Sequence, residues 1–475
     1  MADTFQKGTS LVHEDRLFPA NLDMRDIARR LYSEVKDLPI ISPHGHTDPS
    51  WFANNAPFGN PAELLLAPDH YIYRMLYGQG ISLDALGVPS KAGNPDTDPR
   101  EAWRIFAENY YLFRGTPSRL WLDHVFNEVF GLSEPLDGST ADAYYDVINT
   151  ALQSDAYRPR ALFDRFNIEL LATTECPTDT LDHHKTIQSS GWGGRVISAY
   201  RPDAVIDADH ERFQAALDEF ADITGEETRS WTGYLAAHRK RREDFKAIGT
   251  TSSDHGHPTA FTADLGAAEA EALFDKVVAG KGTAKDHELF RGQMLTEMAR
   301  MSVDDGLVLQ IHPGSCRNHN GPLFQSHGRD KGADIPMQTD YVHALRPLLN
   351  AFGNDPRLSI IVFTLDETSY SRELAPLAGH YPALKLGPAW WFHDSPEGMR
   401  RFREQTTETA GFYNTVGFND DTRAFLSIPA RHDVARRVDC SFLARLVAEH
   451  RLREDEAQEL ARALAYDLAK AAYKL

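Results

Sequence analysis

Leu38 to Pro49 read LPIISPHGHTDP, an apolar segment that ends in two histidines one residue apart. Its two isoleucines are β-branched and favour a β-strand, and Pro49 opposes regular continuation. Because successive side chains of a strand point to opposite faces, His44 and His46 would point the same way. The stretch therefore predicts a strand whose carboxyl end presents two imidazoles to one metal ion. Two partly buried histidines bonded to backbone are the alternative.

Short apolar runs recur along the chain, with segments long enough for helices between them. There are about eight of them, at residues 38–44, 168–174, 195–200, 245–251, 307–312, 358–364, 384–390 and, more weakly, 414–420. This alternation is typical of parallel βα units. We therefore predict an α/β fold, most simply a TIM-like (β/α)8 barrel.

Residues 51–166 separate the first two runs and are rich in Trp, Tyr, Phe and Leu at helical spacing. We predict that they form a large, mostly helical insertion after the first strand. Further helices are expected within residues 209–242, 265–303 and 432–475. The predicted division of the chain is an N-terminal segment with the first strand (1–50), the insertion (51–166), and the rest of the barrel with C-terminal helices (167–475).

The net charge of −19 limits the possible partners of this 475-residue chain. A field of that sign opposes the approach of nucleic acid or of an anionic membrane, so we expect neither as a partner. It also opposes small anions. An anionic substrate would therefore need a local cluster of arginines.

The three cysteines, Cys176, Cys316 and Cys440, stand far apart and form no CxxC pattern. This spacing disfavours a disulfide framework and a thiolate zinc site, and it fits a reducing cytosol. The N-terminal stretch MADTFQKGTSLVHEDRLFP lacks the apolar region of a signal peptide, and no stretch approaches the roughly 18 apolar residues of a membrane helix. We expect a cytoplasmic protein.

Polar residues follow most of the apolar runs, at the points where the predicted strands end. They are His44 and His46, Arg201, Asp254 and His255, His312 and Arg317, Trp390 and Trp391, and Asp420, Asp421 and Arg423. Functional groups gather at the carboxyl ends of the strands in a parallel barrel. Two imidazoles and one carboxylate, from Asp420 or Asp421, are a normal ligand set for Zn²⁺ or a similar divalent ion. No lysine closes the fourth run and no histidine closes the sixth, so we predict a site for a single ion.

Several separated motifs together resemble one known family, the uronate isomerases, also called glucuronate isomerases, of the amidohydrolase superfamily. The resemblance runs from about Leu38 to Ala435 and rests on motifs that occur in order along the chain. These are HxH at His44 and His46, DHYxxR from Asp69, TTxxPxDxLxHHxxI from Thr173, YRPD from Tyr200, SDHG from Ser253, IHPGSCRNHN from Ile311, LGPAWWF from Leu386 and DDTRAFLS from Asp420.

The resemblance implies that His44, His46 and Asp421 are the metal ligands, because the family's aspartate precedes an arginine by two residues, as Asp421 precedes Arg423. It implies that Tyr71 is the acid/base tyrosine. The implied substrate contacts are His70, Arg201, Arg423 and one of Trp390 and Trp391. The chain departs from the family pattern in the glycine between the two histidines and in the second carboxylate at Asp420.

His312 and Asp254 are further candidates for contact with the substrate. With a single metal ion, His312 is at least as well suited to bond a substrate as to bind metal. Asp254 would hold a water at the metal site or a substrate hydroxyl, and its alternative is to cap the following helix.

The implied reaction moves a carbonyl from C1 to C2 of an open-chain uronate, such as D-glucuronate to D-fructuronate or D-galacturonate to D-tagaturonate. We hypothesise that Tyr71, acting with His46, carries the proton between C2 and C1, while Asp421 and His44 assist ring opening. A phenol has an ordinary pKa of about 10, so Tyr71 would need a nearby cation to act as a base. Arg201 and Arg423 would bind the sugar carboxylate, unless local acids pair with them instead.

Two other functions remain open on sequence alone. A metal-dependent hydrolase of a sugar-acid lactone or amide would use the same barrel and histidine pair. A barrel that binds acid sugars without turnover is the other. We expect a small-molecule uronate as the partner, one divalent metal ion, with zinc as the first choice, as the cofactor, and a homo-oligomer of unspecified size.

Overall fold

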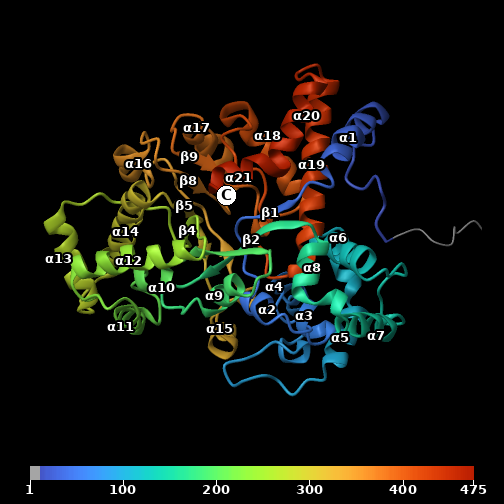
Figure 1. Ribbon diagram of the computed structural model, residues 1–475, viewed down its shortest axis with the longest axis horizontal. Helices are drawn as coiled ribbons and strands as arrows, with labels where there is room; N and C mark the ends of the chain where they lie inside the picture. Colours follow the sequence, from blue (N-terminus) through green and yellow to red (C-terminus); the bar gives the residue numbers. More distant parts are fainter. Residues whose placement is uncertain (1–10) are drawn as a thin grey trace, which may run out of the picture.

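Parallel strands form the centre of the protein, which the computed structural model describes from residue 11 to residue 475 (Figure 1). Within those residues one sheet has seven strands in the order β1-β2-β3-β4-β5-β8-β9, and all neighbours pair in parallel. Their bounds are β1 (Ile40–Ser42), β2 (Ile168–Glu175), β3 (Arg195–Tyr200), β4 (Ser252–His255), β5 (Val308–Ile311), β8 (Ile360–Val362) and β9 (Leu384–Leu386). The sheet curls into a half-barrel among many helices, so the predicted α/β fold with a parallel sheet is confirmed.

The prediction of a fourth strand at residues 245–251 is wrong. Helix α12 (Trp231–Ala247) runs into it, because Phe245 continues the buried side of that helix. The strand in this position of the sheet is β4, which follows at Ser252 and consists of four buried residues, Ser, Ser, Asp and His. A strand of buried polar side chains lacks the hydrophobic pattern on which the prediction relied, and the predicted strand was therefore placed too early in the chain.

The eighth predicted run, residues 414–420, forms no regular strand in the described chain. Thr415 makes an isolated parallel bridge with Leu386 at the end of β9. Farther along the same segment, the carbonyl of Thr422 accepts a hydrogen bond from the backbone N–H of His46 at 3.0 Å. The segment thus contacts β9 at one end and the residues after β1 at the other, and the predicted eight-stranded barrel is present only in part.

The C-terminal helix α21 (Leu468–Tyr473) packs against the inner side of the sheet (Figure 1). Its Ala469 contributes to a buried cluster with residues of β1, β2 and β3. Ala472 and Tyr473 contribute to a second cluster with residues of β5 and β8. The Tyr473 hydroxyl donates a hydrogen bond of 2.8 Å to Oε1 of Gln310 on β5. Side chains of this helix therefore fill space between the strands.

The crossover helices cover the outer side of the sheet, where they share a large apolar cluster with Leu309, Ile311, Ile360 and Leu384. They are α10 (Asp203–Ile206), α11 (Phe213–Thr224), α12, α13 (Ala267–Val278), α14 (Ala284–Asp305), α16 (Arg346–Phe352), α17 (Ala375–Ala378) and α18 (Pro396–Ala410). Helices α9 (Asp182–Ser189) and α15 (Gly321–His327) instead contribute Ile187 and Leu323 to the apolar cluster of the helices between β1 and β2. The N-terminal α1 (Leu22–Val35) packs with α19 (Ile428–Ala448) and α20 (Glu454–Arg462).

The segment between β1 and β2 is built from helices, at the lower right of Figure 1. They are α2 (Pro49–Asn54), α3 (Pro61–Leu65), α4 (His70–Tyr77), α5 (Pro99–Glu108), α6 (Pro117–His124), α7 (Ala141–Leu152) and α8 (Pro159–Arg165). Their apolar core includes Ile40 of β1 and Ile168 of β2, so the helices and the sheet share buried contacts. The division at residues 50 and 166 stays a prediction.

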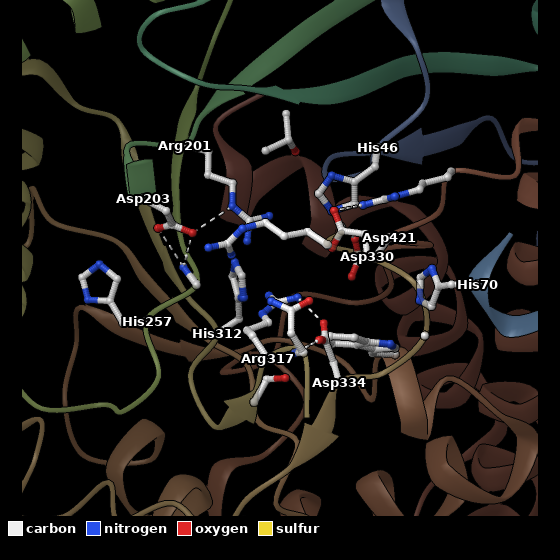
Figure 2. Close-up of a pocket in the computed structure, with 18 of the residues that line it drawn as sticks. His46, His70, Arg201, Asp203, His257, His312, Arg317, Asp330, Asp334 and Asp421 are labelled. Carbon is white, nitrogen blue, oxygen red and sulfur yellow. Dashed lines mark hydrogen bonds and ion pairs between the residues drawn. The ribbon is translucent and has the colours of Figure 1, made fainter. Parts of the chain in front are cut away.

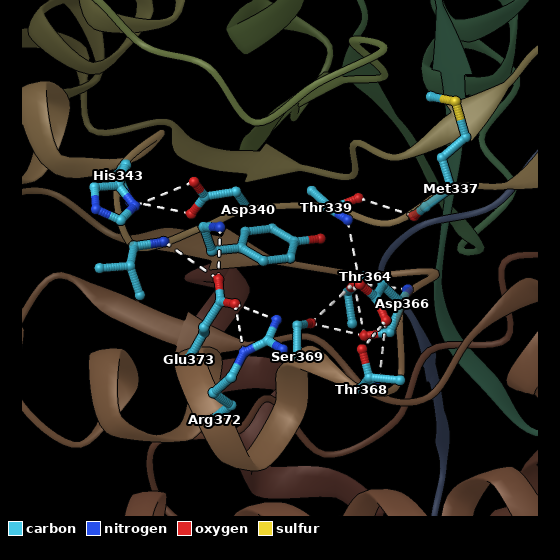
Figure 3. Close-up of polar contacts among 12 residues, drawn as sticks. Met337, Thr339, Asp340, His343, Thr364, Asp366, Thr368, Ser369, Arg372 and Glu373 are labelled. Carbon is cyan, nitrogen blue, oxygen red and sulfur yellow. Dashed lines mark hydrogen bonds and ion pairs between the residues drawn. The ribbon is translucent and has the colours of Figure 1, made fainter.

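A short antiparallel hairpin, β6 (Ser315–Cys316) with β7 (Ile335–Pro336), interrupts the crossover from β5 to β8. The loop that follows β7 is tied to the residues after β8 (Figure 3). Thr339 N donates to Oδ2 of Asp366 at 3.2 Å, and Tyr341 N donates to Oε2 of buried Glu373 at 2.8 Å. These bonds hold the long loop against the carboxyl end of β8.

No helix among residues 11–475 is long and apolar enough to cross a membrane. The three cysteines are free, and Cys440 is buried. The first part of the N-terminal stretch, in which we expect no signal peptide, lies outside the described residues.

Candidate active site

The carboxyl ends of the strands open into one cavity of about 970 Å³. Ten of the side chains predicted from the sequence line it: His44, His46, His70, Tyr71, Arg201, His312, Trp390, Trp391, Asp421 and Arg423. Figure 2 shows how several of them converge from different strands and loops. Asp254 is fully buried behind the wall. Segments that are far apart in the sequence therefore meet where the barrel geometry predicts a site.

His44, His46 and Asp421 form a group in which one ligand atom from each lies within 4.8 Å of the others. Asp421 Oδ1 lies 3.4 Å from Nε2 of His44 and 3.1 Å from Nε2 of His46. Yet this buried oxygen makes no hydrogen bond with a described residue. Two imidazole nitrogens and a carboxylate oxygen are a normal ligand set for a divalent cation. Because no hydrogen bond joins Asp421 Oδ1 to the two imidazoles, the group is better explained as a metal site than as a hydrogen-bonded cluster.

The charges in this group suit a cation. Burial by itself would raise the pKa of Asp421, but the facing imidazoles hold it well below its usual value, so the carboxylate is ionised. Burial lowers the pKa of His46 and keeps its imidazole neutral at pH 7. The pKa of His44 is raised, because Asp254 and Asp421 outweigh the effect of its burial.

Asp420 and Asp421 have different neighbours. Asp420 Oδ2 forms a hydrogen bond of 3.0 Å with Nε2 of His432, on the side of α19. Asp421 faces the histidine pair, and its backbone φ of +40° lies in the left-handed region, which is rare for a residue other than glycine. Such strain is typical of functional positions held by their surroundings. The structure thus places Asp421, rather than Asp420, with the two histidines.

Asp254 links three of the predicted site residues. Its Oδ1 lies 2.9 Å from Nε2 of His312, and its Oδ2 lies 3.4 Å from Arg201. Burial opposes its charge, but His312, His44 and Arg201 hold the pKa of Asp254 well below its usual value. Asp254 caps no helix, because it is part of β4. It is a buried negative charge that orients the groups lining the cavity.

Four of the arginines that line the cavity are paired with acids. Arg201 Nε donates to Oδ2 of Asp203 at 3.0 Å, and Arg423 lies 3.1 Å from Asp330. Arg317 and Arg329, which also line the cavity, pair with Asp334 and Glu211. The local cluster of arginines expected for an anionic substrate is present. Each of these guanidinium groups, however, already has a carboxylate partner that an anion would have to displace or share.

His70 and Tyr71 lie in the first turn of α4, which begins there because the Asp69 side chain accepts a hydrogen bond of 2.9 Å from Tyr71 N. The two rings stack at 4.6 Å. Nε2 of His70 is buried and has no hydrogen-bond partner among the described residues, and burial lowers the pKa of His70 to about 3. His70 is therefore a neutral group with an open position for a substrate.

Burial also raises the pKa of Tyr71 above its ordinary value, although the cation of Arg431 opposes this effect. The Arg431 guanidinium lies 5.2 Å from the Tyr71 ring centroid and 3.6 Å from that of Trp121. The phenol of Tyr71 is therefore protonated at neutral pH in the protein alone. The expectation that neighbouring cations would bring it toward a useful range is not met by Arg431 by itself.

The two tryptophans lie after β9, outside regular strand, so the alternation expected for adjacent strand residues does not apply. Trp390 donates its indole N–H to the Thr364 carbonyl at 3.0 Å and packs in an apolar cluster. Trp391 has a left-handed φ of +50°, and its buried Nε1 has no hydrogen-bond partner among the described residues. The Arg317 guanidinium lies 4.9 Å from its ring centroid. Both indoles line the cavity, and of their two N–H groups that of Trp391 is the one without a partner among the described residues.

Sequence reasoning missed Asp330 and Arg431. Asp330 lies in the loop between α15 and β7, where no strand end points to it. Arg431 is fully buried on α19 and pairs with Asp394, which follows β9. The local sequence marks neither residue, because α19 carries several other charged residues, such as Arg436 and Asp439, and Asp330 follows no strand.

Comparisons with known proteins show the family of this chain. The family model for glucuronate isomerase matches residues 16–473. A uronate isomerase from Phenylobacterium zucineum is 71% identical over 98% of this chain and 97% of its own length. The crystal structure of glucuronate isomerase from Caulobacter crescentus has a TM-score of 0.97 and 71% identity, and covers 98% of this chain and 97% of that one.

A likeness of fold alone extends to a protein from Lactobacillus casei described as a candidate metal-dependent hydrolase. It is 15% identical, has a TM-score of 0.52, and covers 94% of this chain and 97% of that one. A family model that spans nearly all of the described chain, together with relatives of 71% identity over nearly its full length, leaves one assignment. This chain belongs to the glucuronate isomerase family.

Proposed function

We propose that this protein interconverts the aldose and ketose forms of uronates, as D-glucuronate with D-fructuronate and D-galacturonate with D-tagaturonate. The observation that carries the proposal is one cavity that holds both a His-His-Asp group and arginines suited to a carboxylate. A uronate needs both features, one for the carbonyl end and one for the acid end.

We infer that His44, His46 and Asp421 hold one divalent ion, with Zn²⁺ as the first choice for two imidazoles and a carboxylate. Such an ion supplies Lewis acidity toward the sugar oxygens, where negative charge develops during isomerisation. The unbonded Asp421 oxygen between the two imidazoles supports this assignment.

Arg423 and Arg201 are the proposed partners of the sugar carboxylate. The Arg423 side chain is 37% exposed, and its partner Asp330 belongs to a loop, so a substrate carboxylate can take the place of Asp330. Arg201 is more enclosed and keeps Asp203 and Asp254. Because guanidinium groups bind carboxylates through two parallel hydrogen bonds, the pair selects acid sugars over neutral ones.

Proton transfer between C2 and C1 is assigned to Tyr71 with His46. Both side chains line the cavity. The charge of Asp421 by itself raises the pKa of Tyr71, and a cation held by His44, His46 and Asp421 would offset that effect. Removal of the C2 proton gives an enediol, and return of a proton to C1 completes the ketose. Asp421 and His44 are assigned to ring opening. His70 Nε2 and Trp391 Nε1, neither of which has a hydrogen-bond partner among the described residues, would bond substrate hydroxyls, and His312 is a further candidate.

Incubation with D-glucuronate and D-galacturonate in D₂O tests the proposal. We expect ¹H NMR to show a ketose product, with deuterium at C1 in the share of turnovers where the carried proton exchanges with solvent. Cleavage of a lactone or amide instead would favour the hydrolase, and unchanged sugars that bind would favour a binding protein. Metal analysis of wild type and Asp421→Asn is the companion measurement, and equal metal content in the two would contradict the ligand assignment.

Three further inferences, on the barrel, the cellular compartment and the oligomeric state, accompany this proposal. We infer that residues 414–422 occupy the eighth position of the barrel, since they contact β9 and the residues after β1. We also infer a cytoplasmic enzyme, in keeping with three free cysteines. The expected homo-oligomer can be checked by light scattering on the purified protein.

A further inference from the structure

The motif His-Gly-His occurs twice at the carboxyl end of a parallel strand. His44 and His46 follow β1, and His255 and His257 stand at the end of β4. The rings of the first pair are 5.3 Å apart and inclined by 85°. Those of the second pair are 5.8 Å apart and inclined by 86°. The second pair thus repeats the geometry that the first pair presents to Asp421.

A carboxylate faces the second pair as well. Asp203, at the start of α10, offers an oxygen within 4.8 Å of one nitrogen from each of His255 and His257. Asp203 is held in place by the backbone N–H of Gly256, which donates to its two oxygens at 3.1 and 3.2 Å. Figure 2 shows Asp203 and His257 on the opposite side of Arg201 from His46. The two groups are therefore separate.

The histidines of this second group have open ring nitrogens. His257 is 3% exposed, and neither Nδ1 nor Nε2 has a hydrogen-bond partner among the described residues. His255 is fully buried, and its Nδ1 is also without a partner, while Nε2 lies 3.2 Å from the Ser253 hydroxyl. Buried polar atoms without partners are costly, so they call for an occupant that bonds nitrogen.

The charges around this second group are negative on balance, which favours a bound cation. Arg201 pairs with both Asp203 and Asp254, and Arg291 pairs with Asp207. Asp207 and Arg291 both act on His257. The three carboxylates outnumber the two guanidinium groups.

Glycine at position 256 is required for this packing. A Cβ there would lie 2.7 Å from Arg201 Nη2 and 3.0 Å from Asp203 Oδ2. The close approach of Asp203 to the histidine pair therefore depends on a residue without a side chain.

We propose that Asp203, His255 and His257 form a second divalent-cation site, distinct from the one at His44, His46 and Asp421. Two imidazoles and one carboxylate suit Zn²⁺ or a similar borderline ion. A cation there holds the Asp203 carboxylate, which accepts a hydrogen bond from Arg201 Nε. The site therefore positions Arg201 and takes no part in the reaction itself. The inference does not depend on the proposed reaction, because it concerns metal binding alone.

The test is the number of metal ions bound to the full chain. Protein stripped with a chelator is titrated with Co²⁺, followed by visible absorption, and the bound metal is counted by elemental analysis after gel filtration. We expect two ions per wild-type chain. His46→Gln and His257→Gln should each retain one, and the double variant should retain none. His210→Gln, which changes another histidine lining the cavity, is the matched control and should retain two.

One ion per wild-type chain would overturn the proposal, and this result needs no variant. Equal metal content in His257→Gln and wild type would also overturn it. Circular dichroism verifies that each variant is folded, and His255→Gln replaces His257→Gln if the latter fails to fold. Two ions bound without any conversion of uronates would sink the proposed function and leave this inference standing.

Discussion

Oδ1 of Asp254 lies 2.9 Å from Nε2 of His312 and joins the carboxyl end of β4 to that of β5. Both side chains are buried, and the second oxygen of Asp254 lies 3.4 Å from Arg201. The pair therefore couples the stability of the sheet to the orientation of two groups that line the cavity.

Asp254→Asn should lower the free energy of unfolding by about 3 kcal/mol at pH 7, because the partly buried Arg201 and the buried His312 lose a charged partner. Urea denaturation followed by circular dichroism measures the change. Asp304→Asn is the control, since Asp304 pairs with Arg239 at the surface, and it should cost well under about 1 kcal/mol. Equal effects of the two substitutions would show that the buried pair has no special role.

Arg423→Met should raise the KM for uronates by roughly 10- to 100-fold, because a charge-assisted hydrogen bond to the substrate carboxylate is lost. Steady-state kinetics with D-glucuronate measures it. Arg400→Met removes an exposed arginine that pairs with Glu397 and should leave KM unchanged. If KM for the Arg423 variant matched that of wild type, Arg423 would not belong to the substrate site.

Tyr71→Phe should reduce kcat by about 100-fold or more while the protein stays folded, because general acid/base catalysis is typically worth that factor. The ring contacts with His70 and Trp121 survive the substitution. Tyr77→Phe, on the same helix and partly exposed, is the matched control and should retain full activity. Near-normal turnover in Tyr71→Phe would refute the acid/base role.

Glu175, at the end of β2, predicts a pH dependence of stability. Burial raises its pKa from 4.5 to about 7, although the hydroxyls of Thr173 and Ser198 donate to it. Between pH 4.5 and about pH 7, Glu175 therefore keeps its proton in the folded protein but has lost it in the unfolded chain. Stability from Glu175 is fully present below pH 4.5 and is lost as pH rises through about 7.

The difference in free energy of unfolding between wild type and Glu175→Gln isolates this contribution, because glutamine does not titrate. Wild type should lose about 3 kcal/mol relative to the variant between pH 4.5 and pH 8. Urea denaturation at intervals of pH gives the two curves. Parallel curves would mean that the carboxyl of Glu175 titrates normally in the fold.

Local sequence was sufficient for the strands with apolar residues, such as β2, β5 and β8, because burial of alternating or continuous hydrophobic side chains leaves a readable pattern. It failed for β4, where the buried residues are Ser, Asp and His. Their burial is stabilised by partners on other strands, such as His312 for Asp254. That compensation cannot be read from the strand itself.

The same distinction applies to the site. By itself the sequence determined the candidate groups and their common edge of the sheet, since side chains that follow parallel strands must meet there. Only the tertiary structure decided that Asp421 faces the histidines while Asp420 bonds His432, and that Asp330 reaches Arg423 from a distant loop. The physical reason is that the direction of a side chain in irregular backbone, such as Asp421 at a positive φ, depends on the contacts that hold it and not on a sequence period.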